Sequence, residues 1–163
     1  MLLIRNCSIA LAMLMLAACS KNGCRPDDPC ACTDPSVCAV SAGEAACDFA
    51  KRAGDRVFFA FDKDALTEES KATLVKQACW LKANECRKVI IEGHCDIRGT
   101  SEYNLGLGHR RAQMVKNFLI EQGIEEGRIT VISYGKDKPI EVEGATNQEE
   151  IHQANRVAIS VIE

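Results

Sequence analysis

The sequence has no excess of positive charge and few of the side chains on which catalysis most often depends. Its 20 lysines and arginines are set against 23 aspartates and glutamates, whereas wrapping nucleic acid requires surplus positive charge to displace counterions. The three histidines (His94, His109 and His152) are scattered and accompany no nucleophile motif. We therefore expect neither an enzyme nor a cofactor. The 163 residues show no tandem repeat and allow one ordinary domain with short additions.

The N-terminal region contains an apolar run that is too short to cross a bilayer. After Arg5 the run extends from Ile9 to Ala18, the length of a signal-peptide core. It ends in Leu-Ala-Ala-Cys at Cys19, which resembles the lipobox of bacterial lipoproteins. This resemblance implies cleavage of residues 1–18, acylation of Cys19 and, because Ser20 follows, sorting to the outer membrane. An ordinary signal peptide with an unmodified cysteine is the alternative.

Cysteine is abundant, with ten residues in this short chain. Five lie in a stretch from residue 20 to about residue 52 that holds three prolines but no leucine, isoleucine or methionine. Such a segment has too little apolar surface to offset its chain entropy, so residues 19–52 are predicted to be a tether. The cysteine spacing does not match the paired C-x₂-C pattern of structural zinc sites, so we favour disulfides over a zinc cluster. Their pairing remains open.

Regular periodicity begins at Arg56 and predicts a domain over residues 53–163. Apolar runs predict four strands, at residues 57–61, 88–92, 128–134 and 157–162. Two helices are expected between the first three strands, beginning after the N-caps Thr67 and Thr100, with Gly123 ending the second. This order implies parallel strands joined by right-handed crossovers, and a short connection adds the last strand. The expected fold is an α/β sandwich in which two main helices cover a mixed sheet.

Charged side chains are densest around the second predicted strand and the helix after it. Asp96 lies just past this strand, and Arg111 lies about two turns into the helix. A carboxylate and a guanidinium so placed can face one shallow pocket, because strand exits of α/β sheets often hold ligands. On residue types alone, a structural ion pair between the two is the alternative. His94, Cys95, Asp96 and His109 suggest a metal site, but Cys95 should point away from His94 and Asp96, so no metal is predicted.

The stretch from Glu92 to Ala112 resembles the peptidoglycan-binding motif of OmpA-like domains. The resemblance extends over residues 56–163 in separate blocks: Phe61-Asp62-Lys63, Glu92-Gly93-His94, Asp96, Arg98-Gly99-Thr100, Glu102-Tyr103-Asn104, Arg110-Arg111-Ala112, Ser133-Tyr134-Gly135-Lys136, Lys138-Pro139 and Asn155-Arg156. Within that family, the chain resembles the peptidoglycan-associated lipoproteins of the Tol-Pal system. His109 and Cys95 depart from the family pattern, and Val157 replaces a second arginine. Arg156 is therefore not counted among the site residues.

The resemblance implies that the ligand is the diaminopimelate of the peptidoglycan stem peptide. Asp96 would bind the ammonium at the zwitterionic end of this ligand, and Arg111 would bind the carboxylate through two parallel hydrogen bonds. The resemblance adds four pocket-lining residues: Phe61, Asp62, Asn104 and Leu107.

A protein of this kind would hold the outer membrane to the wall from the periplasmic face, anchored by its acyl chains. By resemblance, its partners would be peptidoglycan, TolB and the other Tol proteins, and it would serve envelope integrity and cell division. One alternative is a structural envelope protein cross-linked to envelope partners by disulfides of the tether. A wall hydrolase is a further alternative that the missing nucleophile disfavours. The sequence leaves open the oligomeric state and whether the host wall is complete or sparse.

Overall fold

The computed structural model describes residues 40–142, 144–145 and 147–163. The predicted signal peptide, the predicted lipidation site Cys19 and most of the predicted tether lie outside the described residues. In the part that is described, no helix is long and apolar enough to span a membrane. Cys47 and Cys95 are the free cysteines of this part, whereas Cys79 and Cys86 are not free thiols.

The four predicted strands form one mixed sheet. They are β1 (Arg56–Phe58), β2 (Val89–His94), β3 (Ile129–Gly135) and β4 (Val157–Ile162), in the spatial order β1-β4-β2-β3. β2 and β3 are parallel, and β4 runs antiparallel to both β1 and β2. The predicted α/β fold with a mixed sheet is therefore confirmed. The insertion of β4 brings its first residues beside the end of β2.

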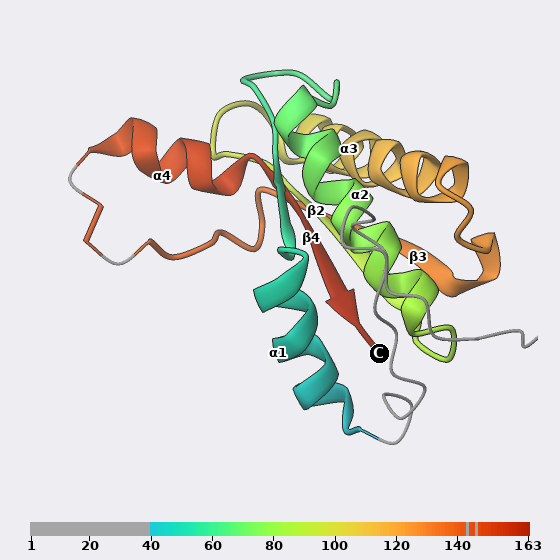
Figure 1. Cartoon of the computed structure of the whole chain (residues 1–163). Coiled ribbons are helices and arrows are strands. Elements are labelled where there is room, and N and C mark those ends of the chain that lie inside the picture. Colours follow the sequence, from blue (N-terminus) through green and yellow to red (C-terminus); the bar gives the residue numbers. More distant parts are fainter. Residues whose placement is uncertain (1–39, 143, 146) are drawn as a thin grey trace, which may run out of the picture.

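The two predicted main helices are α2 (Glu68–Ala83) and α3 (Ser101–Glu121), which lie together on one face of the sheet (Figure 1). Both predicted N-caps are confirmed, because the side chains of Thr67 and Thr100 accept hydrogen bonds from backbone N–H groups of the first turn. α3 ends just before Gly123, which has φ of +90°. A 3-10 turn, η2 (Glu126–Arg128), then leads into β3.

The core lies between these helices and the inner face of the sheet. Val89 and Ile91 of β2 are fully buried against Leu81 and Leu119. α3 approaches β2 most closely at two glycines, where a Cβ on Gly93 would lie only 2.0 Å from the carbonyl oxygen of Gly108. This close approach sets the first half of α3 directly beside the exit of β2.

The prediction of a tether up to residue 52 is wrong in its last part. Ala42–Arg52 form helix α1, which is capped by Ser41. Phe49 of α1 is 1% exposed and meets the ring of Trp80 edge to face, with 5.1 Å between the ring centres. The segment is poor in apolar residues, but a helix that docks on an existing core needs few of them, because α2 supplies the complementary surface.

A further helix, α4 (Gln148–Asn155), interrupts the connection between β3 and β4, where only a short link was expected. It projects from the body of the domain (Figure 1). Its one buried residue is Asn155, whose side-chain oxygen accepts a hydrogen bond from the backbone N–H of Ile140 at 2.7 Å. The helix has almost no apolar stripe, so hydrophobic periodicity could not reveal it.

Candidate binding pocket

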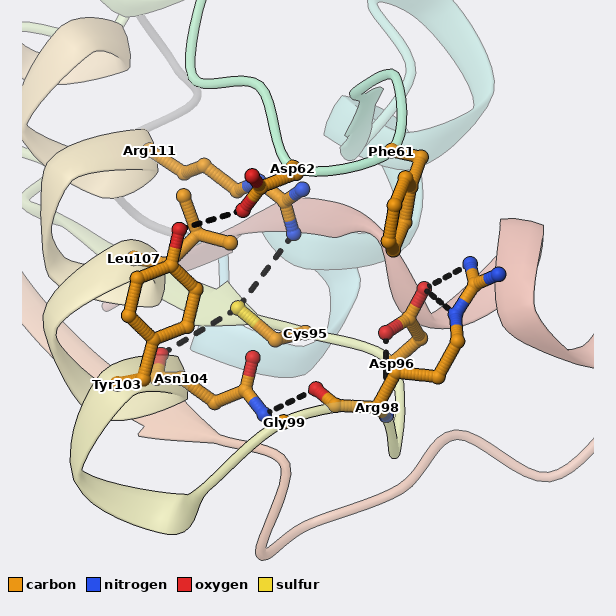
Figure 2. A pocket seen from close by; sticks show the side chains of 10 residues that line it. All are labelled: Phe61, Asp62, Cys95, Asp96, Arg98, Gly99, Tyr103, Asn104, Leu107 and Arg111. Carbon is orange, nitrogen blue, oxygen red and sulfur yellow. Dashed lines mark hydrogen bonds and ion pairs between the residues drawn. The ribbon is translucent and has the colours of Figure 1, made fainter.

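A cavity of about 180 Å³ opens where β1 and β2 leave the sheet and α3 begins. Figure 2 shows that its lining comes from three segments: the loop after β1, the loop after β2 and the first half of α3. All six residues predicted for the ligand site line this cavity: Phe61, Asp62, Asp96, Asn104, Leu107 and Arg111. The structure therefore brings the predicted residues together in one place, while their role in binding remains a prediction.

Asp96 is a buried carboxylate held by two arginines. Its Oδ2 accepts hydrogen bonds from Arg98 Nη2 at 2.5 Å and Nε at 3.2 Å, and from Arg156 Nη1 at 3.3 Å. Among the described residues, its Oδ1 accepts only from the backbone N–H of Arg98, at 3.3 Å. Burial acts to raise the pKa of Asp96, but the hydrogen bonds from Arg98 and Arg156 outweigh it and leave this pKa below its ordinary value. The carboxylate is consequently charged at neutral pH.

Arg111 is 1% exposed and is bonded mainly to backbone carbonyl oxygens. Nε donates to the oxygen of Lys63 at 2.9 Å, Nη1 to that of His94 at 2.9 Å and Nη2 to that of Ala60 at 3.2 Å. Nη1 also lies 3.5 Å from the sulfur of Cys95. Burial lowers the pKa of Arg111, yet a guanidinium keeps its charge in proteins. The site thus contains a fixed positive charge on the α3 side.

These contacts occupy four of the five N–H groups that an arginine carries, one on Nε, two on Nη1 and one on Nη2. The expected pair of parallel bonds from Arg111 to a carboxylate is therefore not free in this structure. The N–H groups of a buried guanidinium need hydrogen-bond acceptors even when no ligand is bound, and here nearby backbone carbonyl oxygens accept from them. One N–H of Nη2 makes none of these contacts and could donate to a ligand. The Nη1 contact with Cys95 is weak, so a ligand oxygen could replace the sulfur most easily there.

Asp96 and Arg111 are not bonded to each other. The ion-pair partners of Asp96 are Arg98 and Arg156, whereas Arg111 donates to carbonyl oxygens and to Cys95. The alternative of a structural ion pair between positions 96 and 111 is therefore wrong. Asp96 and Arg111 instead carry opposite charges in one cavity without pairing.

The remaining walls are apolar with polar edges. Phe61 is 56% exposed, and the guanidinium of Arg98 lies 4.0 Å from the centre of its ring. The hydroxyl of Tyr103 donates to Asp62 Oδ1 at 2.5 Å, and Asn104 Nδ2 donates to the carbonyl of Arg98 at 2.7 Å. Asp62 has φ of +54°, in the left-handed region that non-glycine residues seldom adopt. This turn directs the loop after β1 over the cavity.

Sequence reasoning missed several residues of the site. Cys95, Arg98, Gly99 and Tyr103 also line the cavity. Arg156, which was not counted among the site residues, does not line the cavity, but it is 5% exposed and pairs with Asp96. Arg156 directly precedes β4, and only the insertion of β4 beside β2 places it next to Asp96. The Asn155-Arg156 block was the one signal in the sequence that pointed to it.

The histidines take no part in the lining of the cavity. His94 is 2% exposed, its Nδ1 lies 3.2 Å from the carbonyl oxygen of Lys138, and its Nε2 lies 3.7 Å from Glu92. Burial lowers the pKa of His94, so this ring is neutral at pH 7. His109 is exposed. Within the described ranges, no group of three or more histidine, cysteine or acidic residues is arranged to hold a metal ion.

Comparison with known proteins identifies the family. The sequence profile of the OmpA family matches residues 58–155. The peptidoglycan-associated lipoprotein of Mesorhizobium japonicum is 38% identical over 132 residues, which covers 81% of this chain and 77% of that protein. That of Rhizobium meliloti is 40% identical over 135 residues, which covers 82% and 76% respectively.

A solved structure agrees with these sequence relatives. The crystal structure of the peptidoglycan-associated lipoprotein from Burkholderia pseudomallei matches with a TM-score of 0.61 and 35% identity, covering 67% of this chain and 90% of that one. The chain therefore belongs to the OmpA family and, within it, to the peptidoglycan-associated lipoproteins.

Proposed function

We propose that this protein binds peptidoglycan non-covalently, by holding the zwitterionic end of its diaminopimelate between Asp96 and Arg111. One observation carries the proposal: a single cavity contains a buried carboxylate and a buried guanidinium that are not paired with each other. Such a cavity is complementary to a ligand that carries one ammonium and one carboxylate a few ångströms apart. The names of the relatives, all peptidoglycan-associated lipoproteins, support this ligand.

The geometry suggests which atoms would make the contacts. Asp96 Oδ1 accepts a single hydrogen bond, so a second lone pair remains for an ammonium. In Figure 2 the side chain of Arg98 lies on the far side of this carboxylate from Tyr103 and Cys95. Arg111 would donate to the ligand carboxylate through the second N–H of Nη2 and through the Nη1 N–H that now faces Cys95. The side chain of Leu107 would lie against the aliphatic part of the ligand.

Moderate affinity is expected from this arrangement. Each charge-assisted hydrogen bond contributes about 1.5–3 kcal/mol, and part of this is offset by the loss of ligand freedom. Attachment to a membrane beside the wall raises the effective concentration of the pocket, so that moderate affinity suffices. No residue is required to act as a nucleophile or base, and the proposed function is not enzymatic.

The proposed anchor is the acylated Cys19 at the start of the mature chain. Two or more acyl chains hold a protein on a membrane durably. Because α1 belongs to the domain, the tether would run from Cys19 to Ser41, and chain geometry limits its reach to about 80 Å. In this proposal the protein links the outer membrane to the wall from the periplasmic side and works with TolB and the other Tol proteins in envelope integrity and cell division.

The test is retention of the protein on isolated wall sacculi. Wild-type protein should be retained on sacculi that contain diaminopimelate, and Asp96→Ala should weaken binding by about tenfold or more. Asp64→Ala is the matched control, because Asp64 pairs with Arg110 at the surface and does not line the cavity. Sacculi with lysine in place of diaminopimelate keep the ammonium but lack the carboxylate, so they should bind weakly. Equal retention of wild type and Asp96→Ala would reject the pocket.

A further inference from the structure

α4 projects from the domain (Figure 1), yet a carboxylate in its first turn reaches the charges around the pocket. Glu149, in the first turn of α4, accepts hydrogen bonds through Oε1 from Arg156 Nη1 and Nη2, each at 3.0 Å. Its Oε2 lies 3.7 Å from Arg98 Nη1. These are the same two arginines that donate to Asp96. Glu149 and Asp96 thus share two guanidinium groups.

Both arginines are held in place by further contacts. The side chain of Arg156 is 6% exposed and also donates to the carbonyl oxygen of Phe59 at 3.4 Å and to the side chain of Gln153. Arg98 stacks on Phe61. Arg156 is therefore held even when Glu149 is removed, and Arg98 keeps its bonds to Asp96 and its contact with Phe61. Without Glu149, two positive charges would face the single negative charge of Asp96, and the attraction of this carboxylate for a cationic ligand group would fall.

We propose that Glu149 is a positioning residue for ligand binding, which offsets the charge of Arg98 and Arg156 so that Asp96 keeps its attraction for an ammonium. The identity of the ligand rests on the proposed function, whereas the effect on Asp96 is a property of the protein alone. Glu149 touches no ligand in this account. It acts through the two arginines, and it is the residue of α4 that brings a negative charge to the pocket.

The first test measures the pKa of Asp96 by carboxyl ¹³C NMR in the wild type, Glu149→Gln and Glu150→Gln. Glu150 is the matched control, because it is the next residue of α4 and its Oε1 accepts from Asn147 Nδ2 at 2.7 Å, outside the pocket. If Glu149 offsets the arginines, its removal lowers the pKa of Asp96 further, because a negative charge has left. If Glu149 only holds α4 in place, Arg156 loosens and the pKa of Asp96 rises. A rise, or no change, would overturn the inference.

The second test measures binding of a soluble stem-peptide fragment that ends in diaminopimelate, using the acylated mature protein in detergent. Loss of a partly exposed ion pair such as Glu149–Arg156 is expected to change the affinity for the fragment by about two- to fivefold. Glu149→Gln should weaken binding by that factor, and Glu150→Gln should not. Acetylation of the side-chain amine of the fragment removes its positive charge, so the difference between the two variants should then vanish.

A double variant separates charge from structure. Adding Arg98→Gln to Glu149→Gln removes one of the two uncompensated cations and should restore most of the lost affinity, whereas a damaged α4 would not be repaired by it. Failure of this rescue would contradict the inference. A wild-type protein that binds no diaminopimelate fragment would contradict the proposed function instead, and the pKa of Asp96 would still decide the role of Glu149.

Discussion

The close contact between β2 and α3 makes a quantitative prediction at Gly93. A Cβ at this position would lie 2.0 Å from the oxygen and 2.6 Å from the carbonyl carbon of Gly108. Backbone atoms cannot rotate aside as a side chain would, so Gly93→Ala must push α3 away from the sheet. Overpacking typically costs 1–3 kcal/mol and occasionally more, and we expect about 3 kcal/mol here because the contact is with the main chain. For a domain of this size, that loss corresponds to a fall of about 12 °C in Tm.

Thermal unfolding followed by circular dichroism measures this effect. Gly43→Ala in α1 is the matched control, because a Cβ at Gly43 meets nothing within 4 Å and alanine is favoured in helices by about 0.5–1 kcal/mol. Its Tm should stay the same or rise by a few degrees. Since α3 carries Arg111, Gly93→Ala should also weaken binding to sacculi at temperatures where the domain is folded. Equal Tm values for the two variants would show that the spacing of β2 and α3 is not set by the glycine contact.

Two further predictions concern buried charges. Arg111→Met should lower the free energy of unfolding by about 3–5 kcal/mol in chemical denaturation, since the carbonyl oxygens of Ala60, Lys63 and His94 would lose their donors; a loss below 1 kcal/mol would argue against a structural role for this guanidinium. Burial lowers the pKa of His94 in the folded state below its ordinary value of 6.5. The neutral ring therefore contributes to the free energy of unfolding in full above pH 6.5, and this contribution is lost as the pH falls through the lower folded-state pKa. His94→Gln should remove this part of the pH dependence, and identical pH profiles for variant and wild type would refute the assignment.

Two helices, α1 and α4, could not be predicted from the local sequence pattern. α1 has only two buried residues, Ala45 and Phe49, and α4 has one. α4 has almost no apolar stripe. α1 is amphipathic, but the apolar surface that holds it comes from Trp80, which is 31 residues away from Phe49 along the chain. Composition alone therefore indicated a tether where a helix docks.

The bonding of the site charges could not be predicted either. Residue type suggested that Arg111 offers a free fork to a carboxylate, but a buried guanidinium in an unliganded protein takes the carbonyl groups of whichever loop lies over it. Here that is the loop after β1, which contains Ala60 and Lys63. The partnership of Asp96 with Arg156 likewise joins residues 60 positions apart.

The amino-acid sequence by itself determined the strands, the two capped main helices, the mixed sheet and six of the ten residues that line the cavity, because these depend on local periodicity, capping chemistry and a recognisable order of motif blocks. Only the tertiary structure decided that Asp96 is held by Arg98 and Arg156, that Arg111 is anchored on backbone carbonyls, and that Glu149 reaches both arginines. The contacts of Arg156 arise from the insertion of β4 between β1 and β2, a long-range pairing that no short window of sequence contains.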